Sequence, residues 1–281
     1  MPHGQGHYLK LTWRGEVRRV LVHDPPGHEG RSLPLVLALH GTGGTGRIMA
    51  HLSGLSRLAD ERDFRVAYPQ AQGEPGLEDP VRGAAWNAGP GLGCPLHPGA
   101  DDTAFLQAVV DRVDQHGPVD SRRIHVAGFS NGARMAHRLA LSAPWVSAIA
   151  AVAGAPVWGE APARPVPTLM FHGTGDRHIP FEGGLGALGR QVPALPAREA
   201  AARWAALMGC GPEPGTEDLN AHRLDLWSSD ACQVGFWTVA GMGHAWPGGR
   251  PYAPGADLPA PDLSAAHLIW AFFEAHPLES P

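Results

Sequence analysis

Residues 124–133 read IHVAGFSNGA, and this stretch decides the fold. Its apolar start predicts a buried strand, the glycines around Ser130 predict a sharp turn, and residues 132–142 predict a helix. A serine at such a junction has a strained backbone, and the N-terminus of the helix that follows favours negative charge developing nearby. We therefore predict that Ser130 is a nucleophile; the alternative is a glycine-rich turn with a capping serine.

Strand-like and helix-like stretches alternate on both sides of this junction, which predicts a doubly wound α/β fold. Continuous hydrophobicity is typical of strands that are covered on both faces of a parallel sheet. The expected strands are residues 35–39, 65–68, 124–129, 148–152, 168–171 and 234–239, with an antiparallel edge strand at 17–23. The expected helices are residues 48–61, 102–116, 132–142, 197–208 and 264–275.

Length and composition favour one domain over residues 1–281, with long Gly/Pro-rich loops near 73–100 and 183–196 at the rim of the site. The net charge is −5, from 22 basic and 27 acidic residues, and Lys10 is the only lysine. Nucleic-acid binding, which needs a concentrated basic surface, is therefore not expected. No apolar run reaches the roughly 18 residues that cross a membrane. The N-terminus lacks signal-peptide features, so we expect a cytoplasmic protein unless a leader has been removed.

A serine hydroxyl needs a base, and in α/β-hydrolases the chain order is serine, acid, histidine. His244 lies in GMGHAWP, after the strand at 234–239 and before the last helix, and we predict that it is the base. The chain has 16 histidines, and the rivals considered for this role are His172, His178, His222 and His267.

Asp176 directly follows the buried strand at 168–171, where this fold places the acid that orients the imidazole. Asp225 and Asp230 are rivals in a less buried, alternating segment. A turn or helix cap is the other interpretation of Asp176.

Acyl transfer also needs N–H donors aimed at the tetrahedral oxyanion. Residues 39–45, LHGTGGT, follow an apolar strand like the oxyanion loop of esterases. We predict that the backbone N–H groups of Thr42 and Asn131 are the donors. A phosphate cradle would end in Gly-Lys-Ser/Thr, which is absent here.

Two tryptophans beside these motifs, Trp86 and Trp246, are predicted to form an aromatic wall for substrate, or else to pack under loops. Among the three cysteines, Cys210 and Cys232 can form a local bridge or remain two buried thiols.

Together these residues resemble the polyhydroxybutyrate depolymerase-like and feruloyl esterase-like carbohydrate esterases of the α/β-hydrolase superfamily. The matching pieces, in family order, are HGTGG at 40–44, WNAG at 86–89, Asp101-Asp102, GFSNG at 128–132, HGTGD at 172–176 and GHAWPG at 243–248. The resemblance implies a cofactor-free hydrolase of esters in polymers or plant phenolics. It also implies export, and it places Cys210 and Cys232 where relatives often have a bridge.

The chain departs from these relatives in having no visible leader, and in carrying Cys94 alone where they tend to have two adjacent cysteines. No polymer-binding domain is evident, so we expect a small soluble ester or chain ends as substrate rather than crystalline polymer. We predict a serine-dependent carboxylic ester hydrolase that acts through an acyl-enzyme on phenolic (feruloyl-type) or hydroxyalkanoate and polyester esters, without metal or other cofactor. A peptidase on the same scaffold, or a non-catalytic binding protein, is the alternative. The sequence indicates no oligomeric state.

Overall fold

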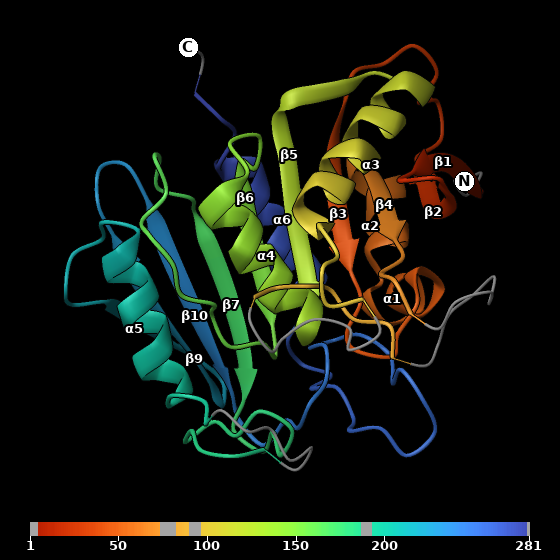
Figure 1. Cartoon of the computed structure of the whole chain (residues 1–281). Helices are drawn as coiled ribbons and strands as arrows, with labels where there is room; N and C mark the ends of the chain where they lie inside the picture. Colours follow the sequence, from red (N-terminus) through yellow and green to blue (C-terminus); the bar gives the residue numbers. More distant parts are fainter. Residues whose placement is uncertain (1–4, 74–82, 90–96, 187–192, 280–281) are drawn as a thin grey trace.

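The apolar runs of the sequence form the centre of one sheet, shown in Figure 1. The computed structural model describes residues 5–73, 83–89, 97–186 and 193–279. The strands are β1 (Gln5–Trp13), β2 (Glu16–Asp24), β3 (Leu33–Leu39), β4 (Arg65–Pro69), β5 (Val119–Phe129), β6 (Ala148–Val152), β7 (Thr168–Gly173), β8 (Gly215–Leu219), β9 (His222–Ser228) and β10 (Gln233–Val239).

Within the described residues the ten strands follow the order β1-β2-β4-β3-β5-β6-β7-β10-β9-β8. The six central strands run parallel to one another, and they are β4, β3, β5, β6, β7 and β10. Every residue of β3, β4, β6 and β7 is buried, as expected for strands that are covered on both faces. The antiparallel hairpin β1–β2 extends one edge, and β9 and β8 extend the other.

Six helices cover the two faces of this sheet in the described part of the chain. They are α1 (Gly46–Ser53), α2 (Leu55–Arg62), α3 (Asp102–His116), α4 (Asn131–Ser142), α5 (Ala197–Leu207) and α6 (Ala265–Ala275). Helices α3, α4 and α5 contribute to one apolar core, and α1, α2 and α6 to the core on the opposite face. Figure 1 shows α3, α4 and α5 in front of the sheet and α6 behind it. The predicted doubly wound α/β fold is confirmed.

Three local expectations need correction. The single helix expected at residues 48–61 is two helices, because Gly54 between them has a left-handed φ of 70°. Strands β1 and β8 were not expected from the sequence. All five residues of β8 are exposed, so this strand carries no apolar signal.

The long loops expected near residues 73–100 and 183–196 lie partly outside the described residues. Cys94 also lies outside them. Their place at the rim of the site stays a prediction, and so does the single-domain extent of residues 1–281. In the part of the chain that the structure describes, no helix has the length and apolarity needed to cross a membrane.

Candidate active site

Ser130 lies in a tight turn between β5 and α4, at the end of the sheet where the parallel strands finish. Its φ of 55° and ψ of −113° are unusual for a residue with a side chain, and such strain is typical of nucleophile elbows. Glycines make the turn possible, because a Cβ at Gly128 would collide with the Gly132 carbonyl and one at Gly132 with the Leu39 carbonyl. The local sequence therefore forces the serine to the tip of the turn.

Asp176 and His244 meet at the ends of two neighbouring parallel strands, β7 and β10. Nδ1 of His244 lies 2.7 Å from Oδ2 of Asp176, and the side chains are 6% and 0% exposed. The other carboxylate oxygen of Asp176 accepts the N–H groups of His178 and Ile179, at 2.8 and 2.9 Å. Burial by itself would raise the pKa of the Asp176 carboxyl, but its hydrogen bond to His244 and the nearby histidine charges outweigh burial and lower it. Asp176 is therefore a carboxylate that fixes the direction of the His244 ring.

Aromatic contacts place this pair beside the elbow. The ring of Phe129, the residue before Ser130, lies 5.0 Å from the ring of His244. On another side the ring of His178 stacks on His244, with centroids 4.8 Å apart. The three residues predicted as nucleophile, acid and base therefore follow three strands of the sheet and gather at one end of it.

Asp257 holds the His244 loop, and no sequence signal pointed to it. Its Oδ2 accepts the backbone N–H of His244 at 2.6 Å. A Cβ at Gly243 would overlap the Asp257 carboxylate, so the glycine makes this close approach possible. Asp257 lies in a Gly/Pro-rich segment without periodicity, 13 residues after His244, and for this reason only the folded chain reveals the contact.

The rival histidines have other partners. Nε2 of His172 donates to the Ile179 carbonyl at 2.8 Å and lies 3.5 Å from Asp176, so this ring supports the acid. Burial lowers the pKa of His172, which keeps it neutral. His222 contacts Asp262 at 3.1 Å, and Nδ1 of His267 lies 2.8 Å from the hydroxyl of Ser264.

The rival acid Asp225 is committed elsewhere too. Its carboxylate binds the guanidinium groups of Arg198 and Arg223. Burial would raise the pKa of Asp225, but the hydrogen bonds from Arg198, Thr216 and Arg223 lower it. It is thus a structural anion. Asp230 follows β9 and is exposed.

The loop after β3 lies against the elbow, since a Cβ at Gly41 would stand 3.1 Å from Cβ of Ser130. Gly43 donates its N–H to Ala84 at 2.7 Å and Gly44 to Gly41 at 3.0 Å. The N–H of Thr42, the residue before Gly43, has no hydrogen-bond acceptor among the described residues. A free N–H beside the serine is what an oxyanion donor requires.

The side chain of His40 holds this loop in place through two hydrogen bonds. Its Nδ1 donates to the Gly41 carbonyl at 2.8 Å, and its Nε2 accepts the N–H of Ala71 at 3.1 Å. Burial lowers the pKa of His40 to about 4, helped by the charge of Arg18, so the ring is neutral. A neutral imidazole can donate on one nitrogen and accept on the other, as this loop requires.

Trp86 links the oxyanion loop to the elbow. The Asn131 side chain accepts the Trp86 N–H at 2.6 Å and donates to the Trp86 carbonyl at 3.1 Å. The indole N–H of Trp86 donates to the His40 carbonyl at 3.0 Å. Asn131 therefore contributes to the scaffold through its side chain. It is also the first residue of α4, and the role of its backbone N–H as second oxyanion donor stays a prediction.

The predicted aromatic wall needs correction. Trp86 is 0% exposed and Trp246 is 1% exposed. A fully buried indole offers no face to a substrate, so both tryptophans pack inside the protein, which was the alternative for them. Tyr252 is a better aromatic neighbour of the site, because it is half-buried and its ring lies 6.0 Å from that of Phe129.

Cys210 and Cys232 are brought together but are present as thiols rather than as the bridge considered from the sequence. Sγ of Cys210 donates to the Cys232 carbonyl at 3.6 Å. Burial, together with the neighbouring Cys210, raises the pKa of the Cys232 thiol to about 12.

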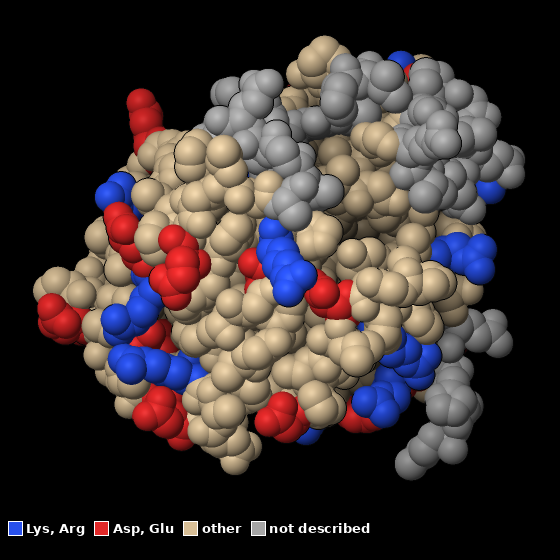
Figure 2. All heavy atoms as spheres, turned by 90° about the horizontal axis from the view of Figure 1, so that it is seen from below, with Lys and Arg blue, Asp and Glu red and all other residues tan. Residues whose placement is uncertain are grey.

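Figure 2 looks onto the end of the molecule where the parallel strands finish. Acidic and basic side chains are interspersed there with a large uncharged area. The described part of this face carries no continuous basic surface, which nucleic-acid binding would need.

The sheet order and the strained serine elbow define an α/β-hydrolase. An acetyl xylan esterase from Aspergillus awamori has a similar fold, with a TM-score of 0.61 at 18% identity over 85% of this chain and 94% of that one. A ferulic acid esterase from Anaeromyces mucronatus gives a TM-score of 0.55 at 14% identity, over 88% of this chain and 86% of the other.

Sequence comparison gives the family. Residues 20–181 match Esterase PHB depolymerase. A protein of Nocardia uniformis subsp. tsuyamanensis named "Putative esterase NocK" is 33% identical over 268 residues, which cover 85% of this chain and 74% of that protein. Feruloyl esterase B of Piromyces equi is 29% identical over 81% of this chain, which spans only 42% of that longer protein. The chain belongs to the Esterase PHB depolymerase family and is a carboxylic ester hydrolase.

Proposed function

We propose that this chain hydrolyses carboxylic esters through an acyl-enzyme on Ser130. The observation that carries the proposal is the buried His244–Asp176 pair, 2.7 Å apart, beside a serine in a strained elbow. Because the N–H of His244 Nδ1 donates to the Asp176 carboxylate, Nε2 keeps its lone pair and can accept a proton. The assigned roles are nucleophile for Ser130, base for His244 and orienting acid for Asp176.

In the first half of the reaction the Ser130 oxygen bonds to the ester carbonyl carbon, and its proton moves to Nε2 of His244. The carbonyl oxygen becomes an anion, which the N–H groups of Thr42 and Asn131 stabilise. When the tetrahedral intermediate collapses, the bond to the alcohol breaks and His244 returns the proton to the leaving alcohol. Water then attacks the acyl group, gives its proton to His244, and the acid leaves as Ser130 regains its hydrogen.

For the substrate we propose an ester of a phenolic acid such as a feruloyl group, with a hydroxyalkanoate ester as the second choice. Feruloyl esterase B supports the first, and the family description supports the second. Tyr252, half-buried beside Phe129, could pack against a phenolic ring. The rim loops near 73–100 and 183–196 would shape the acyl pocket.

The test is Ser130→Ala, assayed on a p-nitrophenyl ester and with a fluorophosphonate probe. We expect both hydrolysis and labelling to be lost while the circular dichroism spectrum is unchanged. Ser121→Ala is the matched control, because Ser121 is exposed near the opposite end of the same strand, β5. If Ser130→Ala hydrolysed the ester at the wild-type rate, Ser130 would not be the nucleophile. Comparing kcat/KM on methyl ferulate, an acetylated sugar and short hydroxybutyrate oligomers then tests the acyl group.

A further inference from the structure

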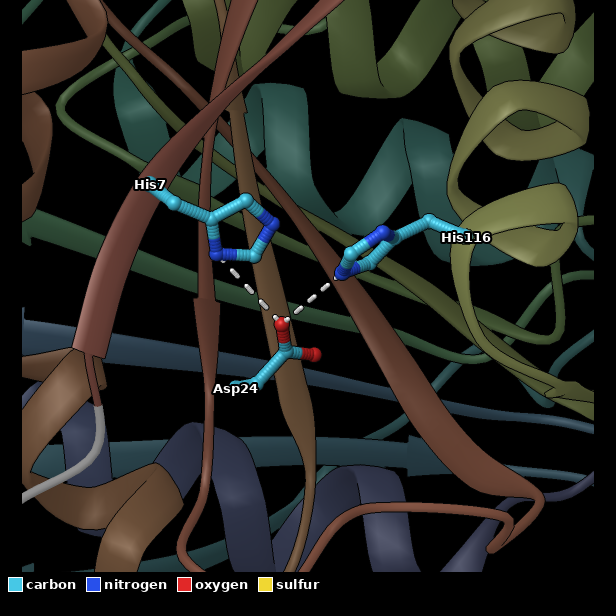
Figure 3. A group of neighbouring side chains, drawn as sticks. All are labelled: His7, Asp24 and His116. Carbon is cyan, nitrogen blue, oxygen red and sulfur yellow. Dashed lines mark ion pairs between the residues drawn. The ribbon is translucent and has the colours of Figure 1, made fainter.

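Three side chains, those of His7, Asp24 and His116, point toward one another, as Figure 3 shows. His7 belongs to the edge strand β1, Asp24 is the last residue of β2, and His116 is the last residue of α3. Asp24 binds Arg65, the first residue of β4, and this places the cluster where the parallel strands begin. The cluster is therefore separate from the proposed ester-hydrolysing site.

The ligand atoms of the cluster are spaced for a metal ion. Oδ2 of Asp24 lies 3.6 Å from Nδ1 of His7 and 3.5 Å from Nε2 of His116, and all three atoms lie within 4.8 Å of one another. Contacts of 3.5–3.6 Å are long for hydrogen bonds. They are close to the edge of a tetrahedron around Zn²⁺, which is about 3.4 Å for metal–ligand bonds of about 2.0–2.1 Å.

The central oxygen also needs a partner. Asp24 is 3% exposed, and its Oδ1 accepts the Nε–H of Arg65. Its Oδ2 is buried and has no hydrogen-bond partner among the described residues. A buried carboxylate oxygen left in this way is costly, and a cation between the two imidazoles would satisfy it.

We propose that Nδ1 of His7, Oδ2 of Asp24 and Nε2 of His116 bind one divalent ion of the Zn²⁺ class. Two imidazoles and one carboxylate suit Zn²⁺, Co²⁺, Ni²⁺ or Cu²⁺ better than Mg²⁺ or Ca²⁺, which prefer oxygen ligands. A site with three protein ligands leaves the fourth position to water. The ion would join β1, β2 and α3, and so its role is structural.

His28 is the residue best placed to assist. Its Nδ1 donates to the Pro25 carbonyl at 3.0 Å, so Nε2 carries the lone pair, and that atom lies 4.0 Å from Oδ2 of Asp24. A modest rotation would make it the fourth ligand or a partner of the bound water. Arg65 acts in the other direction, because its positive charge on the shared carboxylate opposes a cation. We therefore expect weaker binding than in a zinc site built from thiolates.

The experiment uses the full chain without an affinity tag, stripped with EDTA and titrated with Zn²⁺ alone in a calorimeter. We expect one equivalent to bind and the melting temperature to rise. In His116→Ala and in His7→Ala the affinity should fall at least by the roughly 10- to 100-fold that loss of an outer-shell partner costs. His28→Ala should show a smaller loss. His51→Ala, which removes an exposed histidine on α1, is the matched control and should bind like the wild type.

Co²⁺ provides a measurement on the wild type alone, so the test does not depend on the variants folding. A bound ion with tetrahedral nitrogen and oxygen ligands gives a visible absorption band that Zn²⁺ should displace. The proposal is overturned if the wild type binds no stoichiometric Zn²⁺, if Co²⁺ gives no such band, or if folded His7→Ala and His116→Ala bind as well as His51→Ala. Hydrolysis of the p-nitrophenyl ester is a separate readout, which should remain unchanged in these variants.

Discussion

The backbone N–H of His244 donates to Oδ2 of Asp257 at 2.6 Å, while the ring of the same histidine binds Asp176 at 2.7 Å. The two acids thus hold the residue at its two ends. Asp176 sets the direction of the ring, and Asp257 sets the position of the loop that carries it. A hydrogen bond to a charged group contributes about 1.5–3 kcal/mol, so the second contact is a substantial constraint.

Replacing Asp257 is expected to reduce turnover without removing any reacting group. In Asp257→Ala the loop loses its anchor, and a small displacement of the base lowers kcat by about tenfold or more. Asp257→Asn keeps a carbonyl oxygen that can accept the N–H, and should retain most of the activity. Steady-state kinetics on a p-nitrophenyl ester would measure this. Equal loss in both variants would show that the charge of Asp257 matters rather than its hydrogen bond.

The unfolding free energy is expected to fall steeply as the solution becomes acidic. Burial lowers the pKa of His40 to about 4, and the pKa values of His125 and His137 to about 3. The unfolded chain has ordinary histidines with a pKa of about 6.5, so between that pH and about pH 4 it takes up protons that the folded chain does not. Each histidine therefore destabilises the fold by about 2 kcal/mol at pH 5, relative to neutral pH.

His137→Leu tests this linkage at a single position. The ring packs edge-on against Trp204, with centroids 4.4 Å apart, and neither ring nitrogen has a hydrogen-bond partner in the described residues. A leucine of similar volume should preserve the unfolding free energy at neutral pH. Below pH 6, the unfolding free energy of the variant should fall less steeply than that of the wild type, by about 1.4 kcal/mol per pH unit. Urea unfolding followed over this range is the measurement. An unchanged slope would mean that His137 is protonated in the folded chain.

Trp86→Phe is expected to loosen the oxyanion loop. It deletes the indole N–H that donates to the His40 carbonyl at 3.0 Å and leaves that buried carbonyl unsatisfied, at about 1–3 kcal/mol of stability. We expect kcat to fall, because the loop that carries Gly41 and Thr42 would lose one of the contacts that position it beside Ser130. Trp158→Phe is the control, since Trp158 is 50% exposed. If Trp86→Phe had the same kcat as Trp158→Phe, the hydrogen bond from the Trp86 indole would not contribute to catalysis.

Tyr252→Ala should discriminate between acyl groups. If this half-buried ring contacts a phenolic acid, kcat/KM on methyl ferulate should fall by roughly two- to tenfold, while kcat/KM on p-nitrophenyl acetate changes little. Tyr252→Phe keeps the ring and should behave like the wild type on both substrates. A parallel loss on both esters would instead indicate that Tyr252 supports Phe129 and the elbow.

The parts that could be predicted from the sequence are those in which a short segment carries its own physical signal. Two examples are the apolar strands that precede Ser130 and Asp176. They predict the fold, and they also predict the strand ends where polar residues collect. The break at Gly54 depends on the backbone of one residue inside a helical pattern, and the pattern alone does not reveal it.

The remaining features depend on contacts between distant segments. Trp86 lies beside a motif, but only packing shows that its ring is covered. Asp257 meets His244 through a loop without periodicity, and His7 meets His116 across 109 residues of chain (116 − 7). In each case the folded chain decides which partner a polar atom has, and sequence spacing carries no information about that.

The outer strand β8 has a consequence for how the protein behaves at high concentration. An open sheet edge can recruit another chain, and two copies pairing there through a twofold axis would place the central residue Glu217 opposite itself, beside Asp218. Like charges that face each other across paired strands repel. The short, acidic, fully exposed strand therefore resists edge-to-edge aggregation.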